Sequence, residues 1–438
     1  MSGLDPAGPA RPLPRWRPLT RIGFRLSFCY LLLYLFLNGN LTLLAFIPGL
    51  GRWLNWPGMT GAVWAGQHIF HLTGLASRWH GGGSGDTALD YVRIFCLAAT
   101  AAAATLIWSA LDGRRPGYPA LLGWLRFLLR LSVGVGMLAY GFAKVFPLQM
   151  REPTFAILNN TYGNSSPMTL LWTLLGLHPG YEMVCGLAEV AGGLLLLYRR
   201  TATAGALLSA FVMANVVLYN FFFDVPVKIY SLHLLAICLY LLLPDGAPLW
   251  RFFVLRQPAV LTATWVPPGS GEPFLVITRV VEWFYLGLLS LVLVVSSGFS
   301  WRALHPSGAP IPVAGAWQID GVESPNPEAA GLVSAEGKPW ANLYIDNRIQ
   351  GFYRSADGQL WRCIFQYNEA KRTLRIAGPA LRAAEYAWAL PDADHLELTR
   401  KTGGGDAIVL RWHRLPAPEH YALTERGFRW INEWGYER

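Results

Sequence analysis

The chain has 438 residues, of which 53% are hydrophobic and only 14% are charged, and 19 are tryptophans. This composition excludes an ordinary soluble protein, because the apolar residues gather in blocks of roughly 20, the length that crosses a bilayer. The net charge of +9 does not indicate nucleic-acid binding, since the arginines cluster at the ends of these blocks. The chain from about residue 299 onward is polar. We therefore expect a membrane domain in a lipid bilayer, followed by one soluble domain, with no nucleic-acid partner.

Seven apolar blocks predict membrane-spanning helices. They cover residues 22–47, 89–111, 120–146, 180–198, 201–222, 227–243 and 275–298. If the N-terminus is cytoplasmic, the arginine-rich loops 112–119, 199–200 and 244–274 also face the cytoplasm, as the positive-inside rule requires. An odd number of spans then places everything after residue 299 outside.

The loops on the outer side carry structure of their own. Residues 58–75 have helical character broken by glycines, which predicts an interfacial or re-entrant helix rather than a span. Residues 168–177 are apolar but too short to cross a membrane. In the glycine-rich turn at 81–92, Ser84 or Asp86 is placed to cap the second span.

The polar tail has the pattern of an all-β domain. Alternating apolar runs are separated by turn chemistry, as in "WANLYID", "QLWRCIFQY", "RTLRIAG", "EYAWAL", "HLELTR" and "AIVLRWHRL". About eight short strands in meander order predict a small antiparallel barrel or sandwich. The closing stretch "GFRWINEWGYER" has aromatics suited to packing on the barrel or on the bilayer surface.

These patterns divide the chain into six parts. They are a cytoplasmic segment at 1–21, an accessory membrane region with an outer loop at 22–118, a central bundle at 119–250, a cytoplasmic loop at 251–274, a last span at 275–298 and an outer β domain at 299–438. The five cysteines have no redox or metal-binding spacing. We expect neither a disulfide framework nor a metal site.

Ionisable residues at membrane depth mark candidate functional sites, because burying a charge in lipid is costly. Glu189 lies about 13 Å down the fourth span, Lys144 lies in the last turn of the third, and His233 lies in the sixth. These three are the candidate catalytic residues, since a buried carboxylate within reach of a lysine or histidine can move protons. The alternative is that Lys144 only extends to the interface.

A second set of polar residues surrounds them as candidate cofactor-binding groups: Tyr140, Asn215, Asn220, Asp224 and Lys228. The sixth span is expected to begin near Pro226, so Lys228 falls in its first turn and needs Asp224 or Glu189 to neutralise it. The structural alternatives are that the two asparagines join helices through hydrogen bonds and that Asp224 is only a helix-entry residue.

Several stretches resemble the DoxX membrane family, and more narrowly its long bacterial members with extra N-terminal spans and an outer C-terminal domain. They are "LLRLSVGVGMLAYGFAKVFPLQM", "NSSPMTLLWTLLG", "GLAEVAGGLLLLYRRTATAGAL" and "NVVLYNFFFDVPVKIYSLHLLAICLYLLLPD". The resemblance covers most of residues 80–250. It implies a central four-helix bundle built from the third to sixth spans, in a bacterial inner membrane. The family has no single catalytic motif to transfer.

The resemblance and the polar residues together leave three functions open. Relatives are linked to quinol-oxidising and thiosulfate:quinone oxidoreductase complexes, which favours a subunit or accessory of a quinone-linked redox system. Quinone is then the possible cofactor, and a redox or periplasmic protein is the partner, because the sequence has no haem or iron–sulfur motif. The alternatives are an assembly or maturation factor with a ligand- or partner-binding β domain, and a small-molecule transporter. Whether the protein is an enzyme is left open.

Overall fold

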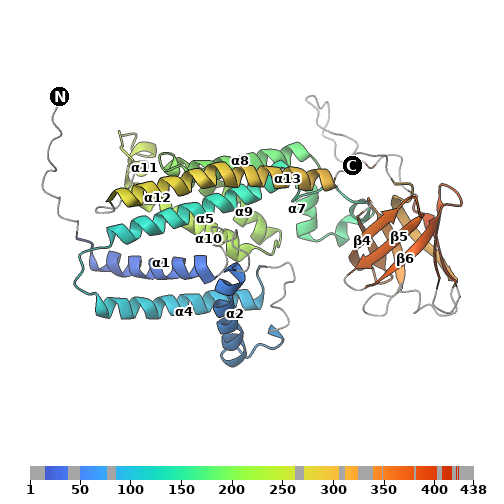
Figure 1. Ribbon diagram of the computed structural model, residues 1–438, viewed down its shortest axis with the longest axis horizontal. Helices are drawn as coiled ribbons and strands as arrows, with labels where there is room; N and C mark the ends of the chain where they lie inside the picture. The colour runs from blue at the N-terminus through green and yellow to red at the C-terminus, as the bar shows by residue number, and fades with distance from the viewer. Residues whose placement is uncertain are drawn as a thin grey trace. The chain divides into compact units, whose positions relative to one another are not determined.

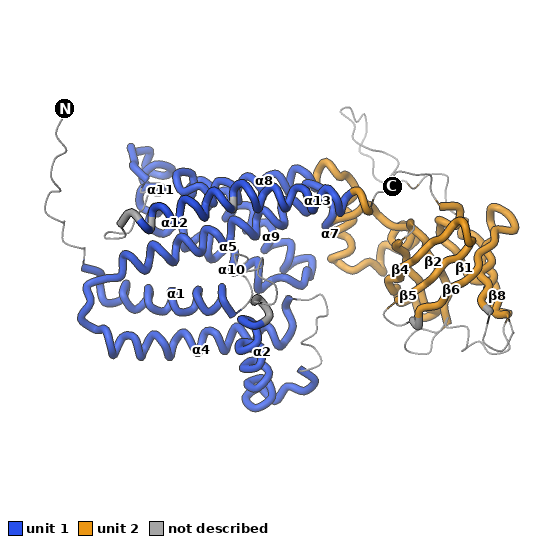
Figure 2. Tube along the Cα trace, in the orientation of Figure 1, with its two compact units in different colours: residues 1–149, 182–301 blue, residues 150–181, 302–438 orange. Residues whose placement is uncertain are grey.

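The architecture is that of a computed structural model, which describes residues 15–37, 50–75, 85–261, 271–304, 311–323, 339–347, 349–378, 381–401, 407–416, 421 and 423. The predicted capping residue Ser84 and the closing stretch 427–438 lie outside these residues. Two compact units are present, one formed by residues 1–149 and 182–301 and the other by residues 150–181 and 302–438 (Figure 2).

Seven helices of the described chain are long and apolar enough to cross a membrane, which confirms the expected helical membrane domain (Figure 1). They are α1 (Pro18–Leu37), α4 (Ala88–Leu111), α5 (Pro119–Val145), α8 (Pro179–Leu197), α9 (Ala202–Phe222), α10 (Lys228–Leu242) continuing through α11 (Gly246–Phe253), and the stretch Leu275–Leu304. The last of these combines α12 (Gly271–Phe284), a π-helical segment η4 (Tyr285–Leu289) and α13 (Ser290–Leu304).

Two predicted helix boundaries need correction or qualification. The sixth spanning helix begins at Lys228, with Val227 at its N-cap, so Pro226 lies before the helix rather than at its first position. The first described helix ends at Leu37, and the rest of the predicted span 22–47 lies outside the described residues. The short helices α2 (Leu50–His68) and α7 (Pro167–Gly176) account for most of the two predicted non-spanning segments.

Helices α5 and α8 approach each other closely because glycines meet at two levels of their contact. A Cβ atom built on Gly186 would lie 2.6 Å from the carbonyl oxygen of Gly141, and one built on Gly193 would lie 2.9 Å from that of Gly134. Both distances are too short for a real side chain. Small residues at such positions allow membrane helices to pack backbone against backbone. We call these four glycines the glycine seam.

The C-terminal domain is a closed barrel of eight antiparallel strands, so the predicted meander is confirmed and closes as a barrel, not a sandwich. The strands are β1 (Gly315–Glu323), β2 (Trp340–Ile345), β3 (Gln350–Ser355), β4 (Leu360–Asn368), β5 (Thr373–Gly378), β6 (Leu381–Ala389), β7 (His395–Lys401) and β8 (Ala407–Arg414). Pairing of β1 with β8 closes the sheet. Closure matters because it leaves no strand edge unpaired.

Alternate residues of the strands fill the barrel interior. The buried positions form one apolar cluster that includes Trp317, Tyr353, Phe365 and Trp412. Strand β4 shows the expected period of two, because Cys363 and Phe365 are buried while their neighbours are more exposed. The Phe365 ring lies directly over Gly351, where a Cβ would collide with it. The barrel is therefore stabilised by a packed core.

The loop between α5 and α8 belongs to the same compact unit as the barrel, although the sequence-based boundaries place it with the helical bundle. The short helix α6 (Phe155–Leu158) lies on the barrel, where the Phe155 N–H donates to a carboxylate oxygen of Asp346 over 2.7 Å. Arg354 donates to the side-chain oxygen of Asn160 over 3.1 Å. We call residues 150–181 the docked loop.

Candidate functional site

Lys144 and Glu189 form a bidentate ion pair inside the helical unit. The Lys144 Nζ lies 2.7 Å from one carboxylate oxygen of Glu189 and 2.8 Å from the other. Both residues are buried, with 7% and 3% of their surface exposed. The sequence predicted that a buried carboxylate lies within reach of a lysine or histidine, and the lysine is the partner that the structure provides.

The glycine seam explains why these two side chains meet. Gly141 lies one helical turn before Lys144 on α5, and Gly186 lies one turn before Glu189 on α8. Because the seam draws the two backbones together, the long lysine side chain reaches the carboxylate across the contact. Charge-assisted bonds to both carboxylate oxygens are short and directional. A pair of this kind neutralises charges that lipid would otherwise disfavour.

Tyr140 lies one turn before Lys144 and faces the same region. The Lys144 Nζ lies 5.8 Å from the centroid of the Tyr140 ring, within the range of a cation–π contact. The ring of Tyr230, from α10, lies 6.0 Å from that of Tyr140. Tyr140 keeps 43% of its surface exposed. Tyr140 is therefore an exposed residue in contact with the buried pair.

His233 does not face this pair. One ring nitrogen lies 2.7 Å from the Tyr30 hydroxyl, and the other lies 2.7 Å from the backbone carbonyl oxygen of Ile229. The imidazole also stacks on Tyr34 at a centroid distance of 3.9 Å with an interplanar angle of 5°. These contacts place His233 at the α1–α10 contact, so the structure separates it from Lys144 and Glu189.

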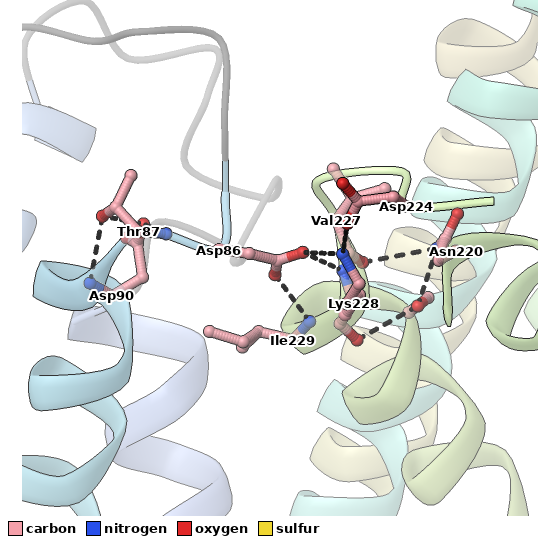
Figure 3. A network of polar contacts seen from close by, with 9 residues as sticks. Asp86, Thr87, Asp90, Asn220, Asp224, Val227, Lys228 and Ile229 are labelled. Carbon is pink, nitrogen blue, oxygen red and sulfur yellow. Dashed lines mark hydrogen bonds and ion pairs between the residues drawn. The ribbon is translucent and has the colours of Figure 1, made fainter. Parts of the chain in front are cut away.

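Asp224 and Lys228 belong to a second polar network, at the start of α10 (Figure 3). The Lys228 Nζ lies 2.8 Å from a carboxylate oxygen of Asp224 and 4.0 Å from one of Asp86. The carboxylate of Asp86 accepts hydrogen bonds from the backbone N–H groups of Lys228, over 2.7 Å, and Ile229, over 2.9 Å. Asp224, and not Glu189, thus neutralises Lys228, with Asp86 nearby.

Asp86 therefore caps a different helix from the one expected. The second spanning helix, α4, is capped by Thr87, which forms a capping box with Asp90 (Figure 3). Asp86, the preceding residue, instead satisfies the free N–H groups at the start of α10. The prediction that Asp86 caps α4 was wrong, because two adjacent residues cap two different helices.

The two predicted asparagines have different surroundings. The side-chain N–H of Asn220 donates to the Ser231 hydroxyl over 2.9 Å and joins α9 to α10. Asn220 is buried, as expected of a residue that connects helices. Asn215 is exposed and donates to the backbone carbonyl of Phe211 within its own helix, over 3.0 Å. In the described part of the chain, these hydrogen bonds of the two asparagines go to Phe211 and Ser231 and not to Lys144 or Glu189.

A second buried ion pair was missed by the sequence reasoning. Arg130 of α5 lies 3.1 Å from a carboxylate oxygen of Glu282 in α12. Arg130 also donates to the backbone carbonyls of Leu196 and Leu197, over 3.0 and 2.9 Å. The signal was a glutamate inside the seventh apolar block, which is costly in lipid and requires a partner.

The described residues contain no group of three or more histidine, cysteine, aspartate or glutamate side chains that could hold a metal ion. The Lys144–Glu189 pair can act by moving a proton between nitrogen and oxygen, because the two atoms are already in hydrogen-bond contact. Tyr140 adds a hydroxyl and an aromatic face beside it. The arrangement thus places a proton-transfer pair beside a hydroxyl group.

Comparisons with known proteins give a family but no activity. No family model matches the chain, and no solved structure matches it. The Bacillus subtilis (strain 168) protein YwoB is 35% identical to this chain over 116 residues, which are 73% of YwoB and 26% of this chain. The chain belongs to the YwoB family.

YwoB is itself an uncharacterized protein, so the relationship assigns no reaction or ligand. It covers about a quarter of the present chain. The resemblance to the DoxX family rests on the quoted sequence stretches alone. The geometry of the Lys144–Glu189 site is therefore what a functional assignment has to be built on.

Proposed function

We propose that the protein is a DoxX-type subunit or accessory of a quinone-linked redox system, in which the Lys144–Glu189 pair handles protons. The proposal includes the bacterial inner membrane as location. It also includes the orientation that the arginine clusters favour, with the N-terminus in the cytoplasm and the β-barrel outside.

One observation carries this proposal: an ion pair bonded through both carboxylate oxygens, buried between two spanning helices, lies beside a partly exposed tyrosine. A lysine and a glutamate in contact can exist as an ion pair or as a neutral amine and acid. In surroundings of low polarity these two forms lie closer in free energy than they do in water. The pair is thus suited to accept or release a proton at membrane depth.

The residues beside the pair fit a quinone head group as substrate. A quinone offers two carbonyl oxygens and reaches its site from the lipid. Tyr140 has a hydroxyl donor and is exposed, while Lys144 has N–H groups next to it. Oxidation of a quinol releases two electrons and two protons. The pair has room for one added proton, so we assign the two protons to it in succession, each released before the next is taken up. We assign the two electrons to a redox partner protein, since the sequence has no haem or iron–sulfur motif.

The direct test is the quinone content of the purified protein. The full chain is extracted in mild detergent from quinone-replete membranes, and its organic extract is quantified by mass spectrometry. We expect bound quinone in the unaltered protein and in Asn215→Ala, an exposed control in the same bundle. We expect it to be lost from Lys144→Met and Glu189→Gln. A folded, unaltered protein without quinone would reject the proposal.

A second candidate function, in assembly or maturation, is favoured by a different observation. The docked loop connects α5 with α8 and is itself bound to the barrel through Asp346 and Arg354. A partner that binds the barrel would thus act on the segment between the two helices of the ion pair. In-cell crosslinking from the barrel surface tests this candidate. Recovery of a stable protein partner without bound quinone would favour it over the redox function.

A further inference from the structure

Four arginines of the helical unit come together from three parts of the chain. Arg126 and Arg130 lie on α5, Arg199 lies in the turn between α8 and α9, and Arg279 lies on α12. We call these residues the arginine cluster. Their grouping follows from tertiary structure, because α12 and α5 are far apart in the sequence.

Arg130 is the fixed centre of the cluster. Its guanidinium is bonded to Glu282 and to the carbonyls of Leu196 and Leu197, which are the last residues of α8. These carbonyls have no partner within the helix and carry its partial negative charge. Arg130 is therefore already satisfied, and its position links α5, α8 and α12.

The other members add positive charge that the local acids do not balance. Arg199 interacts electrostatically with both Arg130 and Glu282, and Arg279 interacts with Glu282. Arg126 interacts with Arg130 and with Asp245. Among the described residues, these four cations thus interact with two carboxylates, and the Asp245 carboxylate also accepts a hydrogen bond from Thr203 over 2.6 Å. A further anion would complete the site.

The cluster lies at the depth of a lipid head group. α8 ends at Leu197, next to the bonds to Arg130, so this level is one end of a spanning helix. The rings of Tyr198 and Trp283 lie 6.4 Å apart at the same level, and Trp283 is exposed. Aromatic residues of this kind concentrate at the membrane–water boundary. Exposed apolar side chains follow further along the same span, namely Phe284, Leu288 and Leu291.

We propose that the arginine cluster binds the phosphate head group of an anionic phospholipid. Arg199 and Arg279 supply the donors to the phosphate oxygens, and the acyl chains lie along the exposed side chains of η4 and α13. Guanidinium groups bind phosphate with two parallel hydrogen bonds, which favours arginine at such sites. Basic sites between spanning helices bind anionic lipids for the same reason. The inference does not depend on the quinone proposal.

A specific phosphate site can be distinguished from the general electrostatic attraction of arginines to an anionic leaflet. If only that attraction acts, any arginine near the same boundary contributes equally. Arg200 is the matched comparison, because it is exposed, directly follows Arg199 and is absent from the electrostatic contacts of Arg130 and Glu282. Arg256, in the loop after α11, completes a control pair of equal charge.

The test is native mass spectrometry of the full chain in detergent with phosphatidylglycerol or phosphatidylcholine added in equal amounts. We expect phosphatidylglycerol adducts on the unaltered protein and on R200Q/R256Q, and several-fold fewer on R199Q/R279Q. Arg130 is left in place, so the helix contacts are kept, and equal monodispersity of the variants checks this. Equal numbers of phosphatidylglycerol adducts on the two double variants would overturn the proposed lipid site.

A second arm distinguishes lipid from free phosphate. Thermal unfolding is followed in detergent with inorganic phosphate alone and with phosphatidylglycerol in mixed detergent micelles. Stabilisation by phosphatidylglycerol, reduced in R199Q/R279Q, supports a lipid site. An equal effect of inorganic phosphate would show a simple anion site and would overturn the assignment to lipid.

Discussion

The Lys144 Nζ contacts both carboxylate oxygens of Glu189, across a helix pair whose backbones meet at glycines. This contact depends both on the glycines of the two helices and on their charged residues. The glycines provide the close approach, and the two charged residues use it to neutralise each other in an apolar region.

Removing one member of the Lys144–Glu189 pair should lower the unfolding free energy more than removing both. Lys144→Met or Glu189→Leu leaves a buried charge without its partner, and we expect a loss of about 3–5 kcal/mol in unfolding free energy. The double variant should recover much of it, because no unpaired charge remains. Thermal unfolding of the three variants in detergent measures this. Additive losses would show that the two residues do not stabilise each other.

The glycine seam should tolerate no added methyl group. In Gly186→Ala the new Cβ would meet the Gly141 carbonyl oxygen and the backbone of Val145, so α8 must move away from α5. We expect a lower unfolding temperature and weaker quinone retention. Gly180→Ala, earlier in the same helix, is the control because no atom lies within 4 Å of its Cβ position. Similar behaviour of both variants would contradict the proposed role of the seam.

Asp86→Ala should destabilise the start of α10 and not that of α4. The loss of an N-capping side chain costs about 0.5–2 kcal/mol. Hydrogen exchange should accelerate at the amides of Lys228 and Ile229, which now lack their acceptor. In Thr87→Ala the acceleration should appear at Asp90 instead. Faster exchange at Asp90 in the Asp86 variant would show that the capping assignment is reversed.

The attachment of the docked loop should weaken as pH rises through about 6. Burial raises the pKa of the Asp346 carboxyl to about 6, against the opposing effect of the hydrogen bond from the Phe155 N–H. The unfolded value is about 3.9. Asp346 therefore binds its proton more tightly in the folded state than in the unfolded state. The stabilisation that this protonation gives is complete below about pH 4 and is lost as the pH rises through about 6.

Asp346→Asn should remove this dependence, because the amide has no charge to bury. Hydrogen exchange of the docked loop, corrected for intrinsic rates, is compared between the variant and the unaltered chain at about pH 4.5 and 7.5. Protection should fall with rising pH in the unaltered chain only. The exposed His395–Asp392 pair titrates in both proteins, so its effect is removed when the two pH profiles are subtracted. Identical pH profiles would contradict the assignment to Asp346.

Hydropathy predicted the helices well where a span is uniformly apolar. The predicted block 89–111 corresponds to α4 at Ala88–Leu111, and 180–198 corresponds to α8 at Pro179–Leu197. Strands β1 and β3 were not singled out in the sequence. β1 is exposed over most of its length, and the closure and register of the barrel come from long-range pairing rather than from a local pattern.

The candidate site was predictable where a charge had a glycine-rich contact beside it, as with Glu189. It was not predictable where helix rotation decides the partner. His233 turns to Tyr30 and Tyr34 because of how α10 packs on α1, and hydropathy does not encode that rotation. The contact between Asp86 and Lys228 spans 142 positions, so no local signal identifies it. Glu282 carried a usable signal, but its partner Arg130 required the structure.

Photolabelling shows directly whether quinone binds beside Lys144 and Glu189. An azido-quinone is activated in membranes containing the full chain, and labelled peptides are identified by mass spectrometry. We expect labelling of the α5 segment around Tyr140 and Lys144, prevented by excess unlabelled quinone and absent in Glu189→Gln. Labelling confined to α1 and α10 around His233, or spread evenly and insensitive to competition, would contradict the assignment.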